Sequence, residues 1–253
     1  MSQISSSEPD PSAGRRSELE KNLAAVRSRI AAACAAADRD PGEITLIAIT
    51  KTRPSADVLL LHELGLDDFG ENKDQEAAPK AAACADVDVA RSQPIRWHFV
   101  GQLQTNKASS VARYADVVHS VDRVRLVRAL GAAAGKAGRE LTCLVQVDLD
   151  TAAGADPARG GVPPAQVREV AEAIEAEPGL ILGGVMAIAP LGADPAQAFA
   201  PLWSCSLSVQ AVNPMATIIS AGMSGDLEAA IGNGATHVRI GTALLGARRP
   251  PVR

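Results

Sequence analysis

Residues 46–53 read L-I-A-I-T-K-T-R, and Pro54 follows directly. The aliphatic part is typical of a buried strand, yet the stretch continues into Lys51, and a charged amine is unfavourable to bury. A lysine at a strand end commonly extends its charged group to solvent. Where apolar residues surround the amine, its charged ammonium form is instead disfavoured. A neutral amine can attack an aldehyde and hold it as a Schiff base. By position alone the solvent-exposed lysine is the commoner case.

Similar aliphatic runs recur along the chain and indicate its fold class. They lie at 44–50, 67–70, 95–100, 116–120, 142–148, 180–187, 215–219 and 236–240, and amphipathic stretches such as 55–64, 123–137, 163–176 and 225–233 lie between them. This alternation favours right-handed βα units, and uninterrupted apolar runs favour parallel strands buried on both faces. Because eight parallel strands can close on themselves, we predict a single (β/α)8 TIM barrel. An open doubly wound sheet is the alternative.

One further helix is predicted before the first strand. Ser17 and Glu20 form a capping-box pattern, and apolar residues follow at helical spacing as far as Ala37. Residues 1–16 are rich in Ser, Pro, Asp and Gly, a composition typical of disorder. We therefore expect a disordered tail over 1–16 and one barrel domain over 17–253.

Composition excludes several classes of function. The net charge is −4, with acids and bases interspersed, and aromatic residues make up 2% of the chain, so neither nucleic acid nor an anionic membrane is an expected partner. No apolar stretch approaches the roughly 18 residues of a membrane span, and the first residues lack the features of a signal peptide. Four scattered cysteines suit reduced core thiols, which predicts a cytoplasmic protein.

The histidines give no support for a metal site. His62, His98, His119 and His237 include no i, i+4 pair. We expect His62 on the surface of a helix and His119 near the end of the fourth strand. His98, near the end of the third strand, and Asn72, after the second, could either line a ligand or be structural.

Two stretches near the C-terminus predict a phosphate site. They read S-A-G-M-S-G-D-L-E at 220–228 and H-V-R-I-G-T at 237–242. Loops after strands seven and eight of a barrel often bind phosphate. Ser224 and Gly225 precede a helix start, and Gly241 and Thr242 offer close backbone approach and a hydroxyl; an ordinary helix cap and a tight turn are the alternatives. A phosphate site and an aldehyde-capturing lysine on one rim indicate one ligand that carries both groups, pyridoxal 5′-phosphate.

Arg239 fits the same ligand. It lies in a strand that otherwise reads as core, and a guanidinium can donate a hydrogen bond to a pyridine nitrogen, although it is not expected to protonate it. A salt bridge inside the barrel is an equally weighted alternative.

The chain closely resembles a known family. I-A-I-T-K-T-R-P, F-G-E-N-K-D-Q-E, W-H-F-V-G-Q-L-Q-T-N-K, G-V-M-A-I-A-P, G-M-S-G-D-L-E-A-A-I and H-V-R-I-G-T occur in this order and look like the pyridoxal phosphate homeostasis proteins, over about residues 17–249. The resemblance implies a barrel related to the N-terminal domain of bacterial alanine racemase, with pyridoxal phosphate held covalently on Lys51. It also implies Ser224, Gly241 and Thr242 at the phosphate, Arg239 at the ring nitrogen, and Asn72 and Met223 against the cofactor.

Three positions depart from the family's usual residue types. Asp148 and Arg159 lie in or near the loop after the fifth strand, and Leu245 stands where phenylalanine is common. We expect these changes to affect that loop and to leave cofactor binding unaltered.

Two functions from different classes remain open. One is a non-catalytic carrier, without catalytic residues, that buffers pyridoxal phosphate or delivers it to apo-enzymes; the other is a weak amino-acid racemase. The resemblance implies that a racemase of this lineage needs a second acid–base, a tyrosine supplied by a partner subunit's β-domain. The only tyrosine here, Tyr114, precedes the fourth strand, and the predicted barrel uses the chain through Arg249. We therefore favour a monomeric carrier. A barrel that binds another phosphorylated molecule non-covalently would leave Lys51 unexplained.

Overall fold

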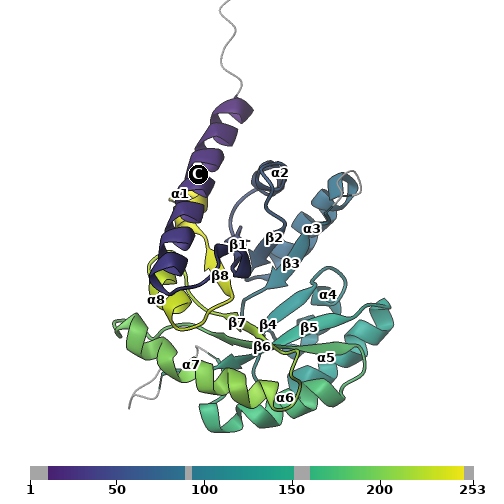
Figure 1. Ribbon diagram of the computed structural model, residues 1–253. Helices are drawn as coiled ribbons and strands as arrows, with labels where there is room; N and C mark the ends of the chain where they lie inside the picture. The colour runs from purple at the N-terminus through teal and green to yellow at the C-terminus, as the bar shows by residue number, and fades with distance from the viewer. Residues whose placement is uncertain (1–10, 89–92, 151–159, 248–253) are drawn as a thin grey trace, which may run out of the picture.

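The computed structural model of the protein, which describes residues 11–88, 93–150 and 160–247, is a closed barrel of parallel strands (Figure 1). The strands follow one another around the barrel in chain order. Their bounds are β1 Thr45–Ile49, β2 Asp68–Glu71, β3 Arg96–Phe99, β4 Val117–Val121, β5 Leu141–Val147, β6 Leu180–Ala187, β7 Ile218–Ser220 and β8 His237–Ile240. β1 pairs with both β2 and β8. The predicted TIM barrel is therefore confirmed, and the open sheet is wrong.

Helices alternate with the strands and cover the outside of the barrel (Figure 1). The α-helices are α1 Pro11–Ala36, α2 Ser55–Glu63, α3 Asp74–Asp88, α4 Ala108–Val111, α5 Val124–Ala137, α6 Val167–Ala176, α7 Pro195–Gln210, α8 Leu227–Gly232 and α9 Thr242–Leu245. Short 3₁₀ turns are η1 Pro41–Glu43, η2 Thr105–Lys107 and η4 Pro164–Gln166. The predicted strands match these bounds to within a few residues, and the largest shift is in β7.

α1 begins six residues before the predicted start at Ser17, so the expectation of disorder is wrong for residues 11–16. Arg15 explains the difference: its Nε and Nη2 donate to the buried carboxylate of Asp57 in α2, at 3.0 and 2.7 Å. Its Nη2 also donates to the carbonyl of Leu245 at 3.1 Å. Such tertiary contacts extend the helix beyond its local capping signal. The rest of the predicted tail, residues 1–10, lies outside the described residues.

The apolar face of α1 closes one side of the molecule. Leu19, Leu23, Val26 and Ile30 are buried in a cluster with residues of β1, β2, β8 and α8. In Figure 1 α1 runs alongside α8, and α9 also packs against it. Asn22 Nδ2 donates to the carbonyl of Leu244 at 3.0 Å. The extra helix therefore supports α8 and α9, the segments that follow β7 and β8.

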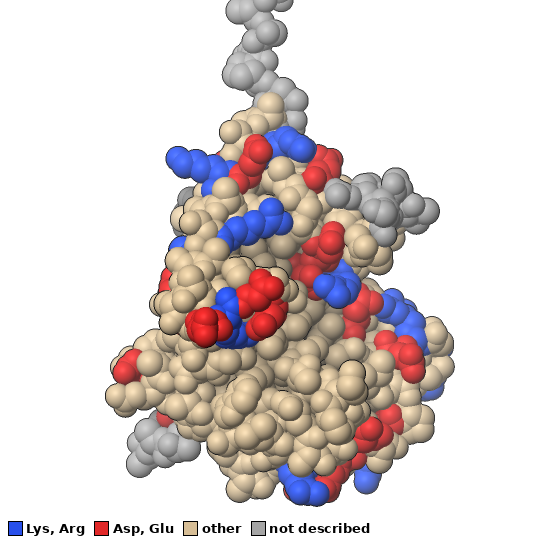
Figure 2. All heavy atoms as spheres, viewed as in Figure 1, with Lys and Arg blue, Asp and Glu red and all other residues tan. Residues whose placement is uncertain are grey.

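The structure also shows the environments of the cysteines, the charged residues and His62. All four cysteines are buried thiols. Among the described residues, no three His, Cys, Asp or Glu side chains are grouped so as to hold a metal, and no helix is long and apolar enough to cross a bilayer. Basic and acidic side chains are interspersed on the face drawn in Figure 2. The prediction for His62 is wrong: its side chain, in the last turn of α2, is buried, and its Nδ1 lies 3.2 Å from the carbonyl of Leu66.

Candidate functional site

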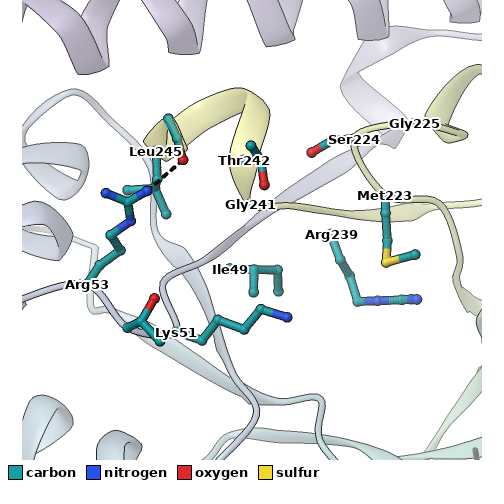
Figure 3. Close-up of a pocket in the computed structure, with 12 residues that line it drawn as sticks. Ile49, Lys51, Arg53, Met223, Ser224, Gly225, Arg239, Gly241, Thr242 and Leu245 are labelled. Carbon is teal, nitrogen blue, oxygen red and sulfur yellow. Dashed lines mark hydrogen bonds between the residues drawn. The ribbon is translucent and has the colours of Figure 1, made fainter. Parts of the chain in front are cut away.

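A pocket opens at the C-terminal ends of β1, β7 and β8, the end of a barrel where active sites are built. Its volume is about 270 Å³, near the lower end of the range for small-molecule sites. The turn after β1, the loop after β7 and the junction of β8 with α9 supply the side chains (Figure 3). The lining residues are Ile49, Lys51, Thr52, Arg53, Met223, Ser224, Gly225, Arg239, Gly241, Thr242, Leu245 and Gly246.

Six of the seven predicted site residues lie in this pocket, and Asn72 is not among its lining residues. Asn72 follows β2, and its backbone packs closely against the turn after β3. A Cβ added to Gly101 would come within 2.0 Å of the Asn72 carbonyl oxygen. The close approach fixes the backbone of Asn72, while a contact between its side chain and a cofactor stays a prediction.

Lys51 is the second residue after β1, and its half-buried side chain reaches into the pocket toward Arg239 (Figure 3). The next residue, Thr52, has a φ of 63°, a left-handed conformation that is unfavourable for a β-branched residue. The N–H of Thr52 donates to Glu76 Oε2 at 2.9 Å, which ties the turn to α3. The backbone at Lys51 is therefore held in one strained conformation, a feature that clusters at functional sites.

A buried ion pair supports the residue on the other side of Lys51. Thr50 Oγ1 donates to Glu71 Oε1 at 2.7 Å, and Lys80 Nζ donates to the Thr50 carbonyl at 2.7 Å. Lys80 also forms an ion pair with Glu71, and all three residues are buried. Sequence reasoning missed this network, although an acid inside the apolar second strand was a signal. The end of β1 is thus anchored to β2 and α3.

Arg239 is almost fully buried at the inner end of the pocket. Its Nη1 donates to Ser220 Oγ at 2.8 Å and its Nη2 to the carbonyl of Ala187 at 2.9 Å. Burial lowers the pKa of Arg239 to about 10, so the guanidinium remains a cation at neutral pH. Within the described residues its hydrogen-bond partners are neutral, which argues against the predicted alternative of a salt bridge inside the barrel.

The opposite side of the pocket is built from small residues and hydroxyls. The hydroxyl of Ser224 points toward Thr242, with Gly241 beside them (Figure 3). A Cβ added to Gly241 would meet only Ile49, at an ordinary contact distance of 3.6 Å. Packing within the chain therefore does not require glycine there, and its effect is to leave pocket space open. Arg29 of α1 donates to the Ser224 carbonyl at 3.1 Å and holds this loop in place.

Arg53 and Leu245 are among the lining residues that the sequence did not predict for the site. Arg53 Nη2 donates to the carbonyls of Gly246 and Ala247, at 2.6 and 2.8 Å, and joins the turn after β1 to the end of α9 (Figure 3). Leu245, one of the departures from the family, also lines the pocket, and the expectation that it leaves cofactor binding unaltered stays a prediction. Sequence spacing cannot reveal such neighbours because α9 folds back over the rim.

The other two departures lie elsewhere. Asp148 follows β5, its side chain accepts a hydrogen bond from the N–H of Asp150 at 2.9 Å, and it is not a lining residue of the pocket. Arg159 lies outside the described residues.

His98 and His119 do not reach the pocket. Both side chains are buried, and their ring nitrogens lie 2.8 Å apart. His119 lies at the middle of β4 and not near its end as predicted. Side chains alternate between the two sides of a strand, and these two point into the barrel interior. The possibility that His98 lines the pocket is therefore wrong.

The pocket carries an unbalanced positive charge. Lys51, Arg53 and Arg239 line it, and its described lining contains no carboxylate, although the whole chain has a net charge of −4. A concentration of cations in a concave site favours an anionic ligand.

Comparison with known sequences places the chain in a family. The family described as alanine racemase, N-terminal domain, matches residues 21–249. The pyridoxal phosphate homeostasis protein of Mycobacterium tuberculosis is 46% identical over 248 residues, covering 93% of this chain and 95% of that protein. The protein of the same name from Pseudomonas aeruginosa is 41% identical, covering 92% and 96%. The chain belongs to the pyridoxal phosphate homeostasis protein family.

Solved structures agree with this family assignment. PipY of Synechococcus elongatus, solved with pyridoxal phosphate bound, is 32% identical with a TM-score of 0.75, covering 90% of this chain and all of that one. Alanine racemase from Corynebacterium glutamicum has a TM-score of 0.66 at 14% identity, covering 92% of this chain and 62% of that one, which shows a shared fold. The homeostasis family thus uses the barrel of the racemases.

The buried pair beneath Lys51 gives the first prediction. Lys80→Met or Glu71→Gln should each lower the free energy of unfolding by about 3–5 kcal/mol, because each leaves one charge buried without its partner. The double variant should lose less than the sum of the two, as measured by urea unfolding. Purely additive losses would contradict the coupling between the two side chains.

Proposed function

We propose that this chain binds pyridoxal 5′-phosphate in the Lys51 pocket, with a covalent link to Lys51, and that it buffers or delivers the cofactor without turning over a substrate. The observation that carries the proposal is the combination of one amine, one buried guanidinium and two hydroxyls in a single cationic pocket. The pyridoxal phosphate bound to PipY, a chain of the same family and fold, supports it.

Lys51 supplies the covalent attachment. Its ε-amine would condense with the aldehyde of the cofactor, forming a carbon–nitrogen double bond with release of water. When bound, pyridoxal phosphate can act as an electron sink for amino-acid chemistry. The strained turn at Thr52 and the buried anchor at Thr50 keep the Lys51 backbone in place, so little ordering of the chain remains to be done on binding.

We assign the remaining pocket residues to two parts of the cofactor, its phosphate and its ring. We assign the phosphate to the hydroxyls of Ser224 and Thr242 and to the open backbone at Gly241, with Arg53 adding a nearby positive charge. Hydrogen bonds from these groups to an anion are stronger than those between neutral partners.

The ring side of the cofactor falls to three residues. Arg239 would donate to the ring nitrogen and, because its pKa of about 10 keeps it a cation, would leave that nitrogen largely unprotonated. Met223 packs against the cofactor from the loop after β7, and we retain Asn72 as a contact from the end of β2.

The position of Tyr114 supports a carrier over a racemase. Tyr114 lies between α4 and β4 and lines a separate groove with Trp97 and Ala81, not the Lys51 pocket. Burial is the main cause that raises the pKa of its phenol, which makes it a poor base. The chain has no other tyrosine, so a second acid–base of this kind is missing from its own pocket. We further propose a cytoplasmic monomer whose recipients are apo-enzymes that use the cofactor.

The covalent link is tested by adding pyridoxal phosphate to purified protein and recording the visible spectrum. The wild type should turn yellow, and borohydride should fix one cofactor on Lys51, detectable by mass spectrometry of the peptides. Lys51→Ala should lose the fixed adduct and retain weak binding through the phosphate. Lys136→Ala, an exposed lysine of α5, is the matched control. A fixed adduct in Lys51→Ala at wild-type yield would refute the assignment.

The phosphate assignment is tested by comparing pyridoxal phosphate with pyridoxal, which lacks the phosphate. Ser224→Ala combined with Thr242→Val should weaken pyridoxal phosphate binding about tenfold or more, because hydrogen bonds to a charged group are lost. Pyridoxal binding should change little. Equal weakening of both ligands would place these hydroxyls elsewhere on the cofactor.

Carrier and racemase are distinguished by incubating the loaded protein with L- or D-alanine and following chirality. A missing acid–base group removes roughly 10²–10⁴-fold in rate, so we expect turnover far below about 1 s⁻¹. Racemisation at or above that rate would overturn the carrier proposal.

A further inference from the structure

A continuous line of hydrogen-bonded side chains crosses the barrel interior, from Arg239 in β8 to Asp68 at the start of β2. Arg239 Nη1 donates to Ser220 Oγ at 2.8 Å, and Ser220 Oγ lies 3.0 Å from His119 Nδ1. His119 Nε2 lies 2.8 Å from His98 Nδ1, and His98 Nε2 lies 2.8 Å from Asp68 Oδ1. All five residues are buried. The line therefore joins five strands, and one of its ends is in the cofactor pocket.

When both histidines are neutral, the chemistry of the two ends fixes the direction of every hydrogen bond between them. A guanidinium can only donate and an ionised carboxylate can only accept. With both histidines neutral, His98 Nε2–H donates to Asp68 and His119 Nε2–H donates to His98. Ser220 O–H then donates to His119 Nδ1, and its lone pair faces Arg239. In this arrangement each hydrogen in the line has an acceptor.

The reverse arrangement satisfies fewer groups. If His98 were a cation, its Nδ1–H would donate to His119, and His119 Nδ1–H would donate to Ser220. Ser220 would then receive two donors, one from His119 and one from Arg239, and its own hydrogen would lose the acceptor that His119 provides. Burial is the main cause that holds the pKa of His119 well below its ordinary value, which favours a neutral ring at that step.

The far end of the line is anchored at the opposite end of the barrel from the pocket. Arg96, the first residue of β3, donates to Asp68 Oδ2 at 2.8 Å, and 57% of its side chain is exposed. Burial alone would raise the pKa of Asp68, but the hydrogen bonds from His98 and Arg96 hold it below its ordinary value. Asp68 is therefore a permanent acceptor at neutral pH.

We propose that Asp68, His98 and His119 are positioning residues for Arg239, acting through Ser220, and that they determine how firmly the ring of the cofactor is held. The inference rests on the proposed function because it concerns the same pocket. Arg239 depends on the lone pair of Ser220, since its other described partner is a single backbone carbonyl. Without His119 the Ser220 hydrogen has no fixed acceptor and can turn toward the guanidinium, where it faces another donor.

A network that only stabilises the barrel would behave differently. Removing one of its members would affect binding by the same factor whether or not Arg239 is present. A positioning role requires that each residue act through Arg239. The loss of binding affinity caused by its removal must therefore vanish once Arg239 is also removed. A double-mutant cycle separates the two cases.

The binding test uses Ser220→Ala and His119→Phe, each in the wild-type and the Arg239→Met background. We expect each to weaken pyridoxal phosphate binding about tenfold with Arg239 present and to have no further effect without it. Ser120→Ala is the matched control: Ser120 is equally buried on β4, and its hydroxyl has no hydrogen-bond partner among the described residues. It should bind like the wild type. Should His119→Phe fail to fold, Ser220→Ala, which removes a single oxygen, decides the case.

A second measurement reads the direction of the line in the protein without cofactor. Long-range ¹H–¹⁵N spectra of ¹⁵N-histidine should show both His98 and His119 protonated at Nε2 at neutral pH, and Ser220→Ala should weaken this preference at His119. An Nδ1-protonated His119, or variants that bind pyridoxal phosphate like the wild type, would overturn the positioning role and leave the proposed function intact. A wild type that fails to bind the cofactor would remove both.

Discussion

Pairing between β1 and β8 closes the barrel, and the site depends on that closure. Thr45 lies opposite His237 and Ala48 opposite Ile240. The two strands come from opposite ends of the chain, and their ends carry Lys51 on one side and Arg239 with Gly241 on the other. In an open sheet these residues would lie on separate edges. Closure brings an amine, a guanidinium and the hydroxyls of the opposite rim into one pocket before any ligand arrives.

The pocket suits a carrier because its binding groups are held from outside by the surrounding chain. Lys51 is fixed between a buried ion pair and a strained turn, the Ser224 loop is held by Arg29, and Arg53 ties the rim to α9. These contacts fix the groups to which we assign the cofactor. The chain offers this pocket no tyrosine that could transfer a proton on the face of the cofactor ring opposite Lys51. Strong holding without a second acid–base group is the property expected of a protein that stores a reactive aldehyde.

Much of the fold could be predicted because parallel strands buried on both faces leave a clear mark in the sequence. The eight strands, the TIM barrel and five of the predicted residues that line the pocket followed from aliphatic runs and from loop positions relative to strand ends, whereas Met223 came only from the family resemblance. What failed depends on tertiary contacts that local patterns cannot encode. α1 starts early because Arg15 reaches Asp57, and His62 is buried because the neighbouring loop covers it. Leu245 enters the pocket because α9 folds over the rim. The interior line from Asp68 to Arg239 involves five strands and has no spacing signal at all.

The packing of α1 against α8 and α9 has a consequence for how the protein folds. Leu19, Leu23 and Val26 precede β1, whereas α8 and α9 follow β7 and β8. The apolar side of α1 is therefore fully covered only when segments from both ends of the barrel have come together. Contacts of such long sequence separation slow folding.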